Sequence, residues 1–312
     1  MSRSTALSSP APVTVRAPAK LNLHLRVGGL RADGFHELTT VYHAVSRYDE
    51  VTASPAATLE VTVRGEGADT VPLDGDNLAV RAATALARRA GIEPLARLDI
   101  VKAIPVAGGL AGGSADAAAA LLACDALWGT DLPRTALLDL AATLGSDVPF
   151  ALTGGTALGT GRGEQLSPVP ATGRWHWVLA FAAGGLSTPA VYRELDRTRP
   201  AGVLPADAGL PAVLAALRSG AVAALSRALG NDLQPAAVSL RPDLQRTLDA
   251  GAALGAIGSL VSGSGPTCAF LAGSAGEAAR LAASLAGAGV CRDVRTACGP
   301  VAGAQVVPAA PR

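Results

Sequence analysis

The stretch that decides the fold is Ile104–Leu121, which reads IPVAGGLAGGSADAAAAL. Its four glycines lie between a predicted strand, Arg97–Pro105, and a predicted helix that runs from about Ser114 to Trp128. Because glycine has no Cβ, the backbone can approach a ligand closely, and N–H groups at a helix start can point at phosphate oxygens. The pattern predicts a phosphate-binding loop, and the alternative is a turn without function in an Ala- and Gly-rich chain.

The glycine loop differs from two familiar phosphate loops. A Walker loop needs Lys and then Ser or Thr after its last glycine, but Gly113 is followed by Ser114 and Ala115. A dinucleotide loop needs a second glycine two positions after Gly108, where Leu110 stands. Both classes are therefore excluded. Two other segments favour a function: the tight turn SGSG at 262–265, and LGSDVPFAL, in which Asp147 lies in an apolar setting.

Composition restricts the protein class. The chain has 312 residues, a net charge of +1, 16% charged and 49% hydrophobic residues, which does not suit a disordered chain or a basic nucleic-acid binder. The most apolar run, Ala115–Trp128, is too short to span a membrane. Cys124, Cys268, Cys291 and Cys298 form no C-x-x-C pair, which favours free thiols in the cytoplasm and no structural zinc. Only Lys20 and Lys102 are lysines.

Strands and helices mix without regular alternation, which predicts an α+β protein in two domains. Apolar residues alternate with polar ones from Leu21 to Val27, as in a half-buried strand. Asp76 is predicted to cap a helix that Gly91 ends. Pro168 and Pro170 mark a predicted linker. Further elements are predicted as strands at 37–51, 58–65, 175–182 and 291–297, the last strand, as a strand pair at 154–165, as helices at 133–144, 187–196 and 275–286, and as a strand–turn–strand at 259–273.

Three segments resemble the signature motifs of the GHMP small-molecule kinases: PAKLNLHLRVGGLRADGFHEL at 18–38, PVAGGLAGGSADAA at 105–118, and SGSGPTCAF at 262–270. The resemblance extends from about Val13 to Gly299. It implies an N-terminal domain over 13–167 that is similar to domain 2 of ribosomal protein S5, and a ferredoxin-like C-terminal domain over 168–305. The ends, 1–12 and 306–312, are expected to be disordered.

The pairing of PAKLNL, RADGFHEL and GSDVPF resembles one branch of this family. That branch uses ATP and Mg²⁺ to phosphorylate the C2 hydroxyl of a cytidine diphosphate-linked methylerythritol, in isoprenoid precursor biosynthesis. The resemblance implies that Asp147 takes or orients the hydroxyl proton, and that Lys20 keeps Asp147 ionised and stabilises the transferred phosphoryl group. Asn22 is expected in the same cluster.

The remaining site residues are also implied by the resemblance. The loop around the ATP phosphates corresponds to Pro105, Val106, Ala107, Gly108, Gly109, Leu110, Ala111, Gly112, Gly113, Ser114 and Ala115, with Ser114 near phosphate or Mg²⁺. Asn77 and Lys102 correspond to positions near the nucleoside of ATP. Gly263, Ser264 and Gly265 correspond to a turn that supports the loop. The cytidine pocket corresponds to Phe35, His36, Thr188 and Tyr192, in which two aromatic rings sandwich the base and His36 reads its polar edge.

The chain departs from the usual family pattern at three positions. Phe35 stands where many relatives have Tyr, so ring stacking is kept but a hydroxyl contact is lost. Ala111 replaces a common Gly, and its methyl group limits the conformations of the loop. Ala115 replaces a common Ser, so one hydroxyl is absent. These changes affect details of phosphate or metal contact and leave the predicted reaction unchanged.

Two alternatives remain at this point. Within the family, the chain could act on homoserine or mevalonate; from another class, it could be a nucleotide-binding regulator without turnover. Retention of both Lys20 and Asp147 argues against the regulator. The expected partner is a small molecule, with neither nucleic acid nor membrane, and the expected state is a monomer or weak homodimer. His24, His43 and His176 are expected to have no role in the site.

Overall fold

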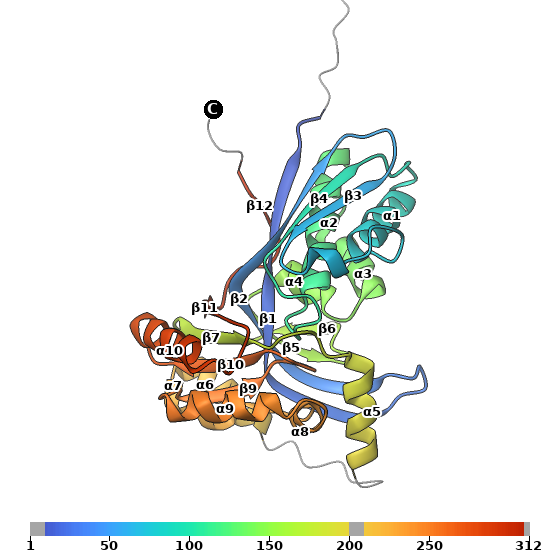
Figure 1. Cartoon of the computed structure of the whole chain (residues 1–312). Coiled ribbons are helices and arrows are strands. Elements are labelled where there is room, and N and C mark those ends of the chain that lie inside the picture. Colours follow the sequence, from blue (N-terminus) through green and yellow to red (C-terminus); the bar gives the residue numbers. More distant parts are fainter. Residues whose placement is uncertain (1–9, 200–208, 309–312) are drawn as a thin grey trace, which may run out of the picture.

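The protein is described by a computed structural model that covers residues 10–199 and 209–308. The expected disordered ends therefore lie largely outside the described residues. The described chain forms two sheets, one of eight strands and one of four, with helices packed on both (Figure 1). The mixture of helices and strands confirms the α+β prediction.

The larger sheet has the strand order β12-β1-β2-β4-β3, with β5 and β8 pairing alongside and β6 pairing β5. Its strands are β1 (Val13–Leu30), β2 (His36–Ser54), β3 (Glu60–Gly65), β4 (Arg97–Lys102), β5 (Thr156–Thr160), β6 (Gln165–Pro168), β8 (Gly230–Asn231) and β12 (Gln305–Val306). β1 and β2 form a long antiparallel hairpin that extends from this sheet to the neighbourhood of α5 (Figure 1). The helices of this half are η1 (Ala68–Thr70), α1 (Leu78–Ala90), α2 (Gly112–Trp128), α3 (Arg134–Leu144) and α4 (Val148–Thr153).

Helix α2 contacts β1, β2, α1 and α4, so it lies at the centre of this half. Its side chains from Ala117 to Ala120 are all completely buried. A row of methyl groups allows the helix backbone to lie close to its neighbours, because the space between packed elements is set by side-chain size. The alanine-rich sequence after the glycine loop thus fixes the start of α2 firmly against the sheet.

The smaller sheet is antiparallel throughout, with the order β11-β7-β10-β9. Its strands are β7 (Trp175–Phe181), β9 (Gly258–Val261), β10 (Cys268–Ala272) and β11 (Asp293–Gly299). The accompanying helices are α5 (Thr188–Thr198), α6 (Gly209–Ser219), α7 (Val222–Ala228), α8 (Gln234–Leu240), α9 (Asp243–Ala253) and α10 (Ala275–Ala288). The tight turn SGSG joins β9 to β10, as the sequence predicted.

The structure corrects three details of the sequence prediction. The strand at 291–297 is not the last, because β12 follows and pairs antiparallel with β1 through Val306 and Val15. Val306, expected in a disordered tail, therefore belongs to the larger sheet. The cap of α1 is Asn77 and not Asp76, since the Asn77 side chain accepts a hydrogen bond from Ala79 N at 2.9 Å. A two-residue strand such as β12 or β8 is too short to show a period-two pattern.

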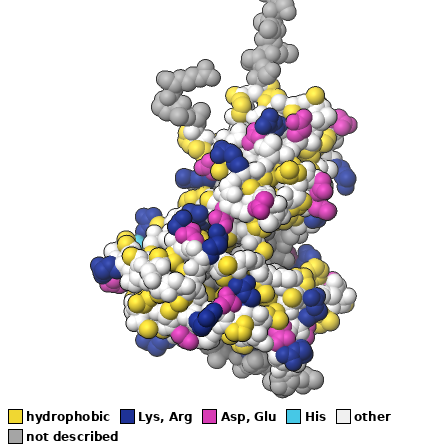
Figure 2. All heavy atoms as spheres, viewed as in Figure 1, with side chains coloured by type: hydrophobic (Ala, Val, Ile, Leu, Met, Phe, Trp, Pro, Cys, Tyr) yellow, Lys and Arg dark blue, Asp and Glu magenta, His cyan; other side chains and the backbone are white. Residues whose placement is uncertain are grey.

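Figure 2 shows basic and acidic side chains interspersed over the face drawn, and the chain as a whole has a net charge of +1. All four cysteines are free thiols. No helix within residues 10–199 and 209–308 combines the length and apolar character that crossing a bilayer demands.

Candidate active site

A cavity of about 710 Å³ lies among the β1–β2 hairpin, the glycine loop, α5 and the SGSG turn. It brings together residues from all three motifs that are far apart in the sequence. The predicted site residues that line it are Lys20, Asn22, Phe35, His36, Ala107, Gly108, Gly109, Ala111, Gly112, Gly113, Ser114, Asp147, Thr188, Tyr192, Gly263 and Ser264. Tyr42, Leu78, Ser146, Arg162 and Asp196 also line it and were not predicted.

The backbone of the glycine loop is held by hydrogen bonds to its carbonyl groups. Four successive carbonyls, from Ala107 to Leu110, each accept from a donor outside the loop. The donors are, in order, Leu186 N at 3.4 Å, Thr267 N at 3.3 Å, Ser262 Oγ at 3.1 Å and Lys20 N at 3.2 Å. With these carbonyls directed into the protein, the loop conformation is fixed before a ligand binds.

Gly109 shows why the loop needs glycine. Its φ is +76°, and a Cβ placed on it would lie 2.2 Å from the carbonyl oxygen of Ser262, so no side chain fits there. Ser262 is the first residue of the SGSG turn. The contact expected between the third motif and the glycine loop is therefore present in the structure.

The N-terminus of α2 is open toward the cavity. Its cap residue, Ala111, makes no side-chain capping hydrogen bond, in contrast to Asn77 at the start of α1. The first N–H groups of a helix have no partner within the helix, and they favour anions such as phosphate. Ala111 adopts φ +61°, a left-handed conformation that is unfavourable for alanine by roughly 1–2 kcal/mol. The sequence departure at this position thus coincides with local strain.

Lys20 and Asp147 meet at the cavity wall, as the resemblance implied. Lys20 Nζ lies 3.7 Å from Asp147 Oδ2, donates to Asn22 Oδ1 at 2.6 Å, and donates to the Gly109 carbonyl at 3.1 Å. The side chains of Lys20 and Asp147 are 8% and 28% exposed. The ammonium therefore connects the glycine loop to a carboxylate that a ligand in the cavity can reach.

Tyr42 contacts the predicted catalytic carboxylate and was not predicted from the sequence. It lies on β2 and donates from its hydroxyl to Asp147 Oδ1 at 2.9 Å. Burial, followed by the negative charge of Asp147, raises the pKa of Tyr42 well above its usual value, so the hydroxyl keeps its proton. Asp147 occupies the cap position of α4 without a capping hydrogen bond. The Asp147 carboxylate is thus held by Tyr42 and Lys20. Nothing in the sequence pattern around Tyr42, one aromatic residue of a strand, indicated this contact.

The predicted aromatic residues gather at the other end of the cavity. Phe35 is 52% exposed, and the guanidinium of Arg162 lies 5.2 Å from its ring centroid. The ring that stacks on Tyr192 is that of His36, with centroids 5.2 Å apart and planes at 27°. His36 Nε2 lies 2.9 Å from Asp196 Oδ1.

Lys102 and Asn77 do not line the cavity. The Lys102 ammonium, 1% exposed, donates to Asp49 Oδ2 and, at 2.6 Å, to Asp116 Oδ2. The structure therefore places Lys102 beneath the glycine loop. Asn77 is used as the cap of α1, but its neighbour Leu78 lines the cavity. Pro105, Val106, Leu110, Ala115 and Gly265 belong to the loop and turn but do not line the cavity in the described chain.

The chain resembles known proteins over most of its length. Residues 77–155 match the GHMP kinases N terminal domain, and residues 213–291 match the GHMP kinases C terminal region. The chain is 61% identical, over 95% of its length and 94% of the relative, to a protein of Salinispora tropica named 4-diphosphocytidyl-2-C-methyl-D-erythritol kinase.

Two solved structures show the same architecture. A 4-(cytidine 5'-diphospho)-2C-methyl-D-erythritol kinase superposes with a TM-score of 0.75 at 35% identity, covering 91% of this chain and 98% of that one. A homoserine kinase from Cytophaga hutchinsonii superposes with a TM-score of 0.75 at 19% identity, covering 98% of this chain and 100% of that one, a likeness of fold alone. The chain therefore belongs to the GHMP kinases, ATP-dependent kinases of small molecules, in the branch of the relatives named 4-diphosphocytidyl-2-C-methyl-D-erythritol kinase.

Proposed function

We propose that the protein transfers the γ-phosphoryl group of ATP to the C2 hydroxyl of 4-diphosphocytidyl-2-C-methyl-D-erythritol. The products are the 2-phosphate and ADP, in the non-mevalonate route to isoprenoid precursors. The observation that carries the proposal is the Lys20 ammonium, which lies 3.1 Å from the glycine-loop carbonyl of Gly109 and 3.7 Å from Asp147. The name of the 61% identical relative supports the choice of acceptor.

The geometry suits phosphoryl transfer because this reaction depends on alignment and charge neutralisation. The acceptor oxygen bonds to the γ-phosphorus while the bond to the bridging oxygen of ADP breaks. Asp147 accepts the hydroxyl proton and later releases it to water, while Tyr42 keeps the carboxylate oriented. Lys20 stabilises the negative charge on the transferred group from its place beside the loop.

Mg²⁺ fits this site as a partner of ATP. Among the described residues, no group of three or more His, Cys, Asp or Glu side chains could hold a metal ion. Mg²⁺ in kinases is commonly held by substrate phosphates and one or two protein oxygens. Ser114 lines the cavity at the start of α2 and would supply such an oxygen. The ion would neutralise phosphate charge there.

The ends of the cavity indicate where the two nucleosides would lie. Leu78 lines the cavity at the start of α1, so the ATP nucleoside would lie near Asn77. The exposed ring of Phe35 and the stacked His36–Tyr192 pair would take the cytidine of the acceptor. Stacking of a base on an aromatic ring contributes about 1–3 kcal/mol, which favours a cytidine-bearing acceptor over homoserine or mevalonate.

The test is an assay of ADP release with purified protein, Mg-ATP and 4-diphosphocytidyl-2-C-methyl-D-erythritol, with homoserine and mevalonate as parallel acceptors. We expect ADP release with the cytidine-bearing acceptor alone, and ³¹P NMR of the product should show a new phosphate on C2. ATP binding without ADP release would favour the non-catalytic regulator. A cytoplasmic location and a monomeric or weakly dimeric state stay predictions from the sequence.

A further inference from the structure

We propose that Asp232 is a positioning residue for the acceptor substrate, because it holds helix α5 in place against strand β1. Helix α5 begins with Thr188 and carries Tyr192, both of which line the cavity. The inference rests on the proposed function in that it takes α5 as a wall of the acceptor pocket. Asp232 itself does not line the cavity, so it would act through the helix.

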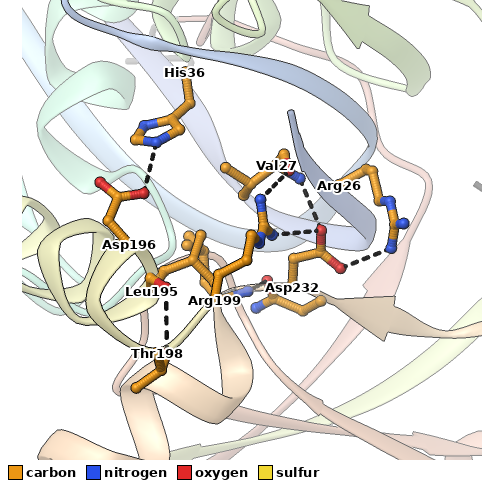
Figure 3. A network of polar contacts seen from close by, with 10 residues as sticks. Arg26, Val27, His36, Leu195, Asp196, Thr198, Arg199 and Asp232 are labelled. Atoms are coloured by element: carbon orange, nitrogen blue, oxygen red, sulfur yellow. Dashed lines mark hydrogen bonds and ion pairs between the residues drawn. The ribbon is translucent and has the colours of Figure 1, made fainter. Parts of the chain in front are cut away.

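The Asp232 carboxylate connects three parts of the chain (Figure 3). Its Oδ1 accepts from Arg26 Nη1 at 3.1 Å, and its Oδ2 accepts from Val27 N at 3.0 Å and from Arg199 Nη2 at 3.2 Å. Arg199 also donates from Nη1 to the Val27 carbonyl at 2.6 Å. Arg26 and Val27 belong to β1, whereas Arg199 is the residue directly after α5. The carboxylate thus fastens the end of α5 to β1.

Helix α5 is attached at its other turns as well. Near its end, Asp196 lies 2.9 Å from His36 Nε2, so the last turn also contacts the start of β2 (Figure 3). At its beginning, Thr188 Oγ1 lies 2.8 Å from Ser264 Oγ of the SGSG turn. The Asp196 side chain is 53% exposed, whereas those of Asp232 and Arg199 are 18% and 16% exposed. Since ion pairs away from solvent are screened less, the Asp232 contact is the stronger attachment of the helix end.

The residue before Asp232 supports the ATP side of the same cavity. Asn231 donates from Nδ2 to the carbonyls of Gly263 at 2.7 Å and Val261 at 2.8 Å, which fixes the turn beneath the glycine loop. Asp232 N donates to the Leu25 carbonyl at 2.9 Å, continuing the pairing of β8 with β1. Loss of the Asp232 carboxylate would therefore loosen the end of α5 while Asn231 still holds the turn. The consequence is a selective effect on the acceptor.

The experiment compares Asp232→Asn with Asp243→Asn in the full-length enzyme. Asp243 forms a comparable ion pair with Arg241 at 2.7 Å, with side chains 32% and 24% exposed, and it does not line the cavity. For Asp232→Asn we expect the KM for the acceptor to rise about tenfold, the change that weakening one charge-assisted hydrogen bond produces. The KM for ATP should stay within about twofold, since the loop contacts are unchanged. Asp243→Asn should leave both KM values at their wild-type level.

A merely structural role for Asp232 would give a different result. It would lower the melting temperature and the fraction of active enzyme, without separating the two KM values. An equal rise in both KM values, or a loss of stability alone, would overturn the proposal. Arg199→Met should raise the acceptor KM as well, and combining it with Asp232→Asn should raise it by less than the product of the two single effects, because the two changes share the Arg199–Asp232 ion pair.

Hydrogen exchange separates a failure of this inference from a failure of the proposed function. In Asp232→Asn the amides of α5 should exchange at least about tenfold faster, while those of α9 stay at the wild-type rate. If wild-type enzyme shows no transfer to the cytidine-bearing acceptor, the proposed function fails, and exchange in α5 still decides whether Asp232 holds the helix. Unchanged exchange in α5 would contradict the inference.

Discussion

The chain has two lysines, and they occupy opposite kinds of environment. Lys20 borders the cavity and faces one carboxylate, Asp147, at 3.7 Å. Lys102 lies beneath the glycine loop, 1% exposed, between Asp49 and Asp116, whose side chains are 0% and 5% exposed. The first cluster, Lys20 with Asp147, is accessible to a ligand and is called the open cluster. The second, Lys102 with Asp49 and Asp116, is buried and is called the sealed cluster.

The sealed cluster holds both ends of the glycine loop. Asp49 Oδ1 accepts from the N–H groups of Ala103 at 2.6 Å and Ile104 at 2.8 Å, at the entrance to the loop. Asp116 lies on α2, just after the loop. Lys102 joins the two carboxylates. Lys102 therefore sets the shape of the glycine loop, whereas Lys20 acts on the ligand groups that the loop holds.

The charges of the sealed cluster reflect its burial. Burial raises the pKa of Asp116 to about 7, although Lys102 opposes the shift. Burial also lowers the pKa of Lys102, but the attraction of Asp116 and Asp49 outweighs it, so the net shift is upward. Lys102 is therefore charged at neutral pH, and one of its two partners is close to taking up a proton.

The largest effect should come from substitution of Asp147, the carboxylate of the open cluster. Asp147→Asn keeps the shape of the side chain but removes the proton acceptor, so we expect kcat to fall by about 10²–10⁴-fold. ATP affinity, measured by calorimetry, should change little. Asp139→Asn, on the exposed side of α3, is the matched control. Turnover within tenfold of wild type would show that Asp147 does not have the assigned role.

Removal of Lys102, the lysine of the sealed cluster, should lower the free energy of unfolding. Lys102→Met leaves two buried carboxylates without their cation, which typically costs about 3–5 kcal/mol in the free energy of unfolding. Urea denaturation measures this change. Adding Asp116→Asn to Lys102→Met should restore part of the loss, because only one carboxylate then stays buried. No restoration would argue against the cluster as a unit.

Removal of Lys20, the lysine of the open cluster, should lower the rate of the reaction. In Lys20→Met the transferred phosphoryl group loses one charged donor, so we expect kcat to fall by about 10²–10³-fold. The free energy of unfolding should fall by about 1–3 kcal/mol, because Asn22 Oδ1 loses its donor, while Asp147 keeps the hydrogen bond from Tyr42. Lys20→Arg should restore little activity, because a planar guanidinium differs in shape from a compact ammonium.

The sealed cluster also predicts a pH dependence. Since the folded pKa of Asp116 lies above the usual value of 3.8, the folded state holds a proton that the unfolded chain loses between pH 4 and 7. The contribution of Asp116 to stability therefore falls as pH rises through this window, by up to about 1.4 kcal/mol per pH unit, and levels off above pH 7. Asp116→Asn should remove this slope from urea unfolding curves. A wild-type-minus-variant difference that stays constant from pH 5 to 8 would contradict the assignment.

The smallest predicted effect concerns the loop backbone. Ala111 has a φ of +61°, so Ala111→Gly relieves strain and should raise the free energy of unfolding by up to about 1 kcal/mol. Ala115→Gly, inside α2, should instead lower it by about 1 kcal/mol. Both changes are read from thermal unfolding. A loss of stability in Ala111→Gly equal to that in Ala115→Gly would show that position 111 is unstrained.

Local patterns predicted most of the fold. Period-two alternation at Leu21–Val27 indicated a strand that lies within β1, glycines and Ser114 located the start of α2, and SGSG was correctly placed between two strands. The same reasoning missed β8 and β12, because two residues carry no period. It also placed the cap of α1 one residue early, since Asp and Asn are equally good caps by residue type.

Only the site residues that belong to a sequence motif could be predicted. The meeting of Lys20 and Asp147 followed from the family resemblance, and the structure shows it at 3.7 Å. Tyr42, Asp196 and Asp232 carry no motif, and their contacts depend on strand register and on how α5 packs. The partners of Lys102 could not be predicted either, because Asp49 and Asp116 lie on two other elements that only the fold brings next to it.

The most direct test of the division between the two lysines is the single-turnover rate of phosphoryl transfer in Lys20→Met and Lys102→Met, each with saturating ATP and acceptor and expressed per folded molecule. We predict a fall of about two to three orders of magnitude for Lys20→Met, and a rate within about tenfold of wild type for Lys102→Met. A Lys20→Met enzyme that transfers phosphate at the wild-type rate would contradict the account.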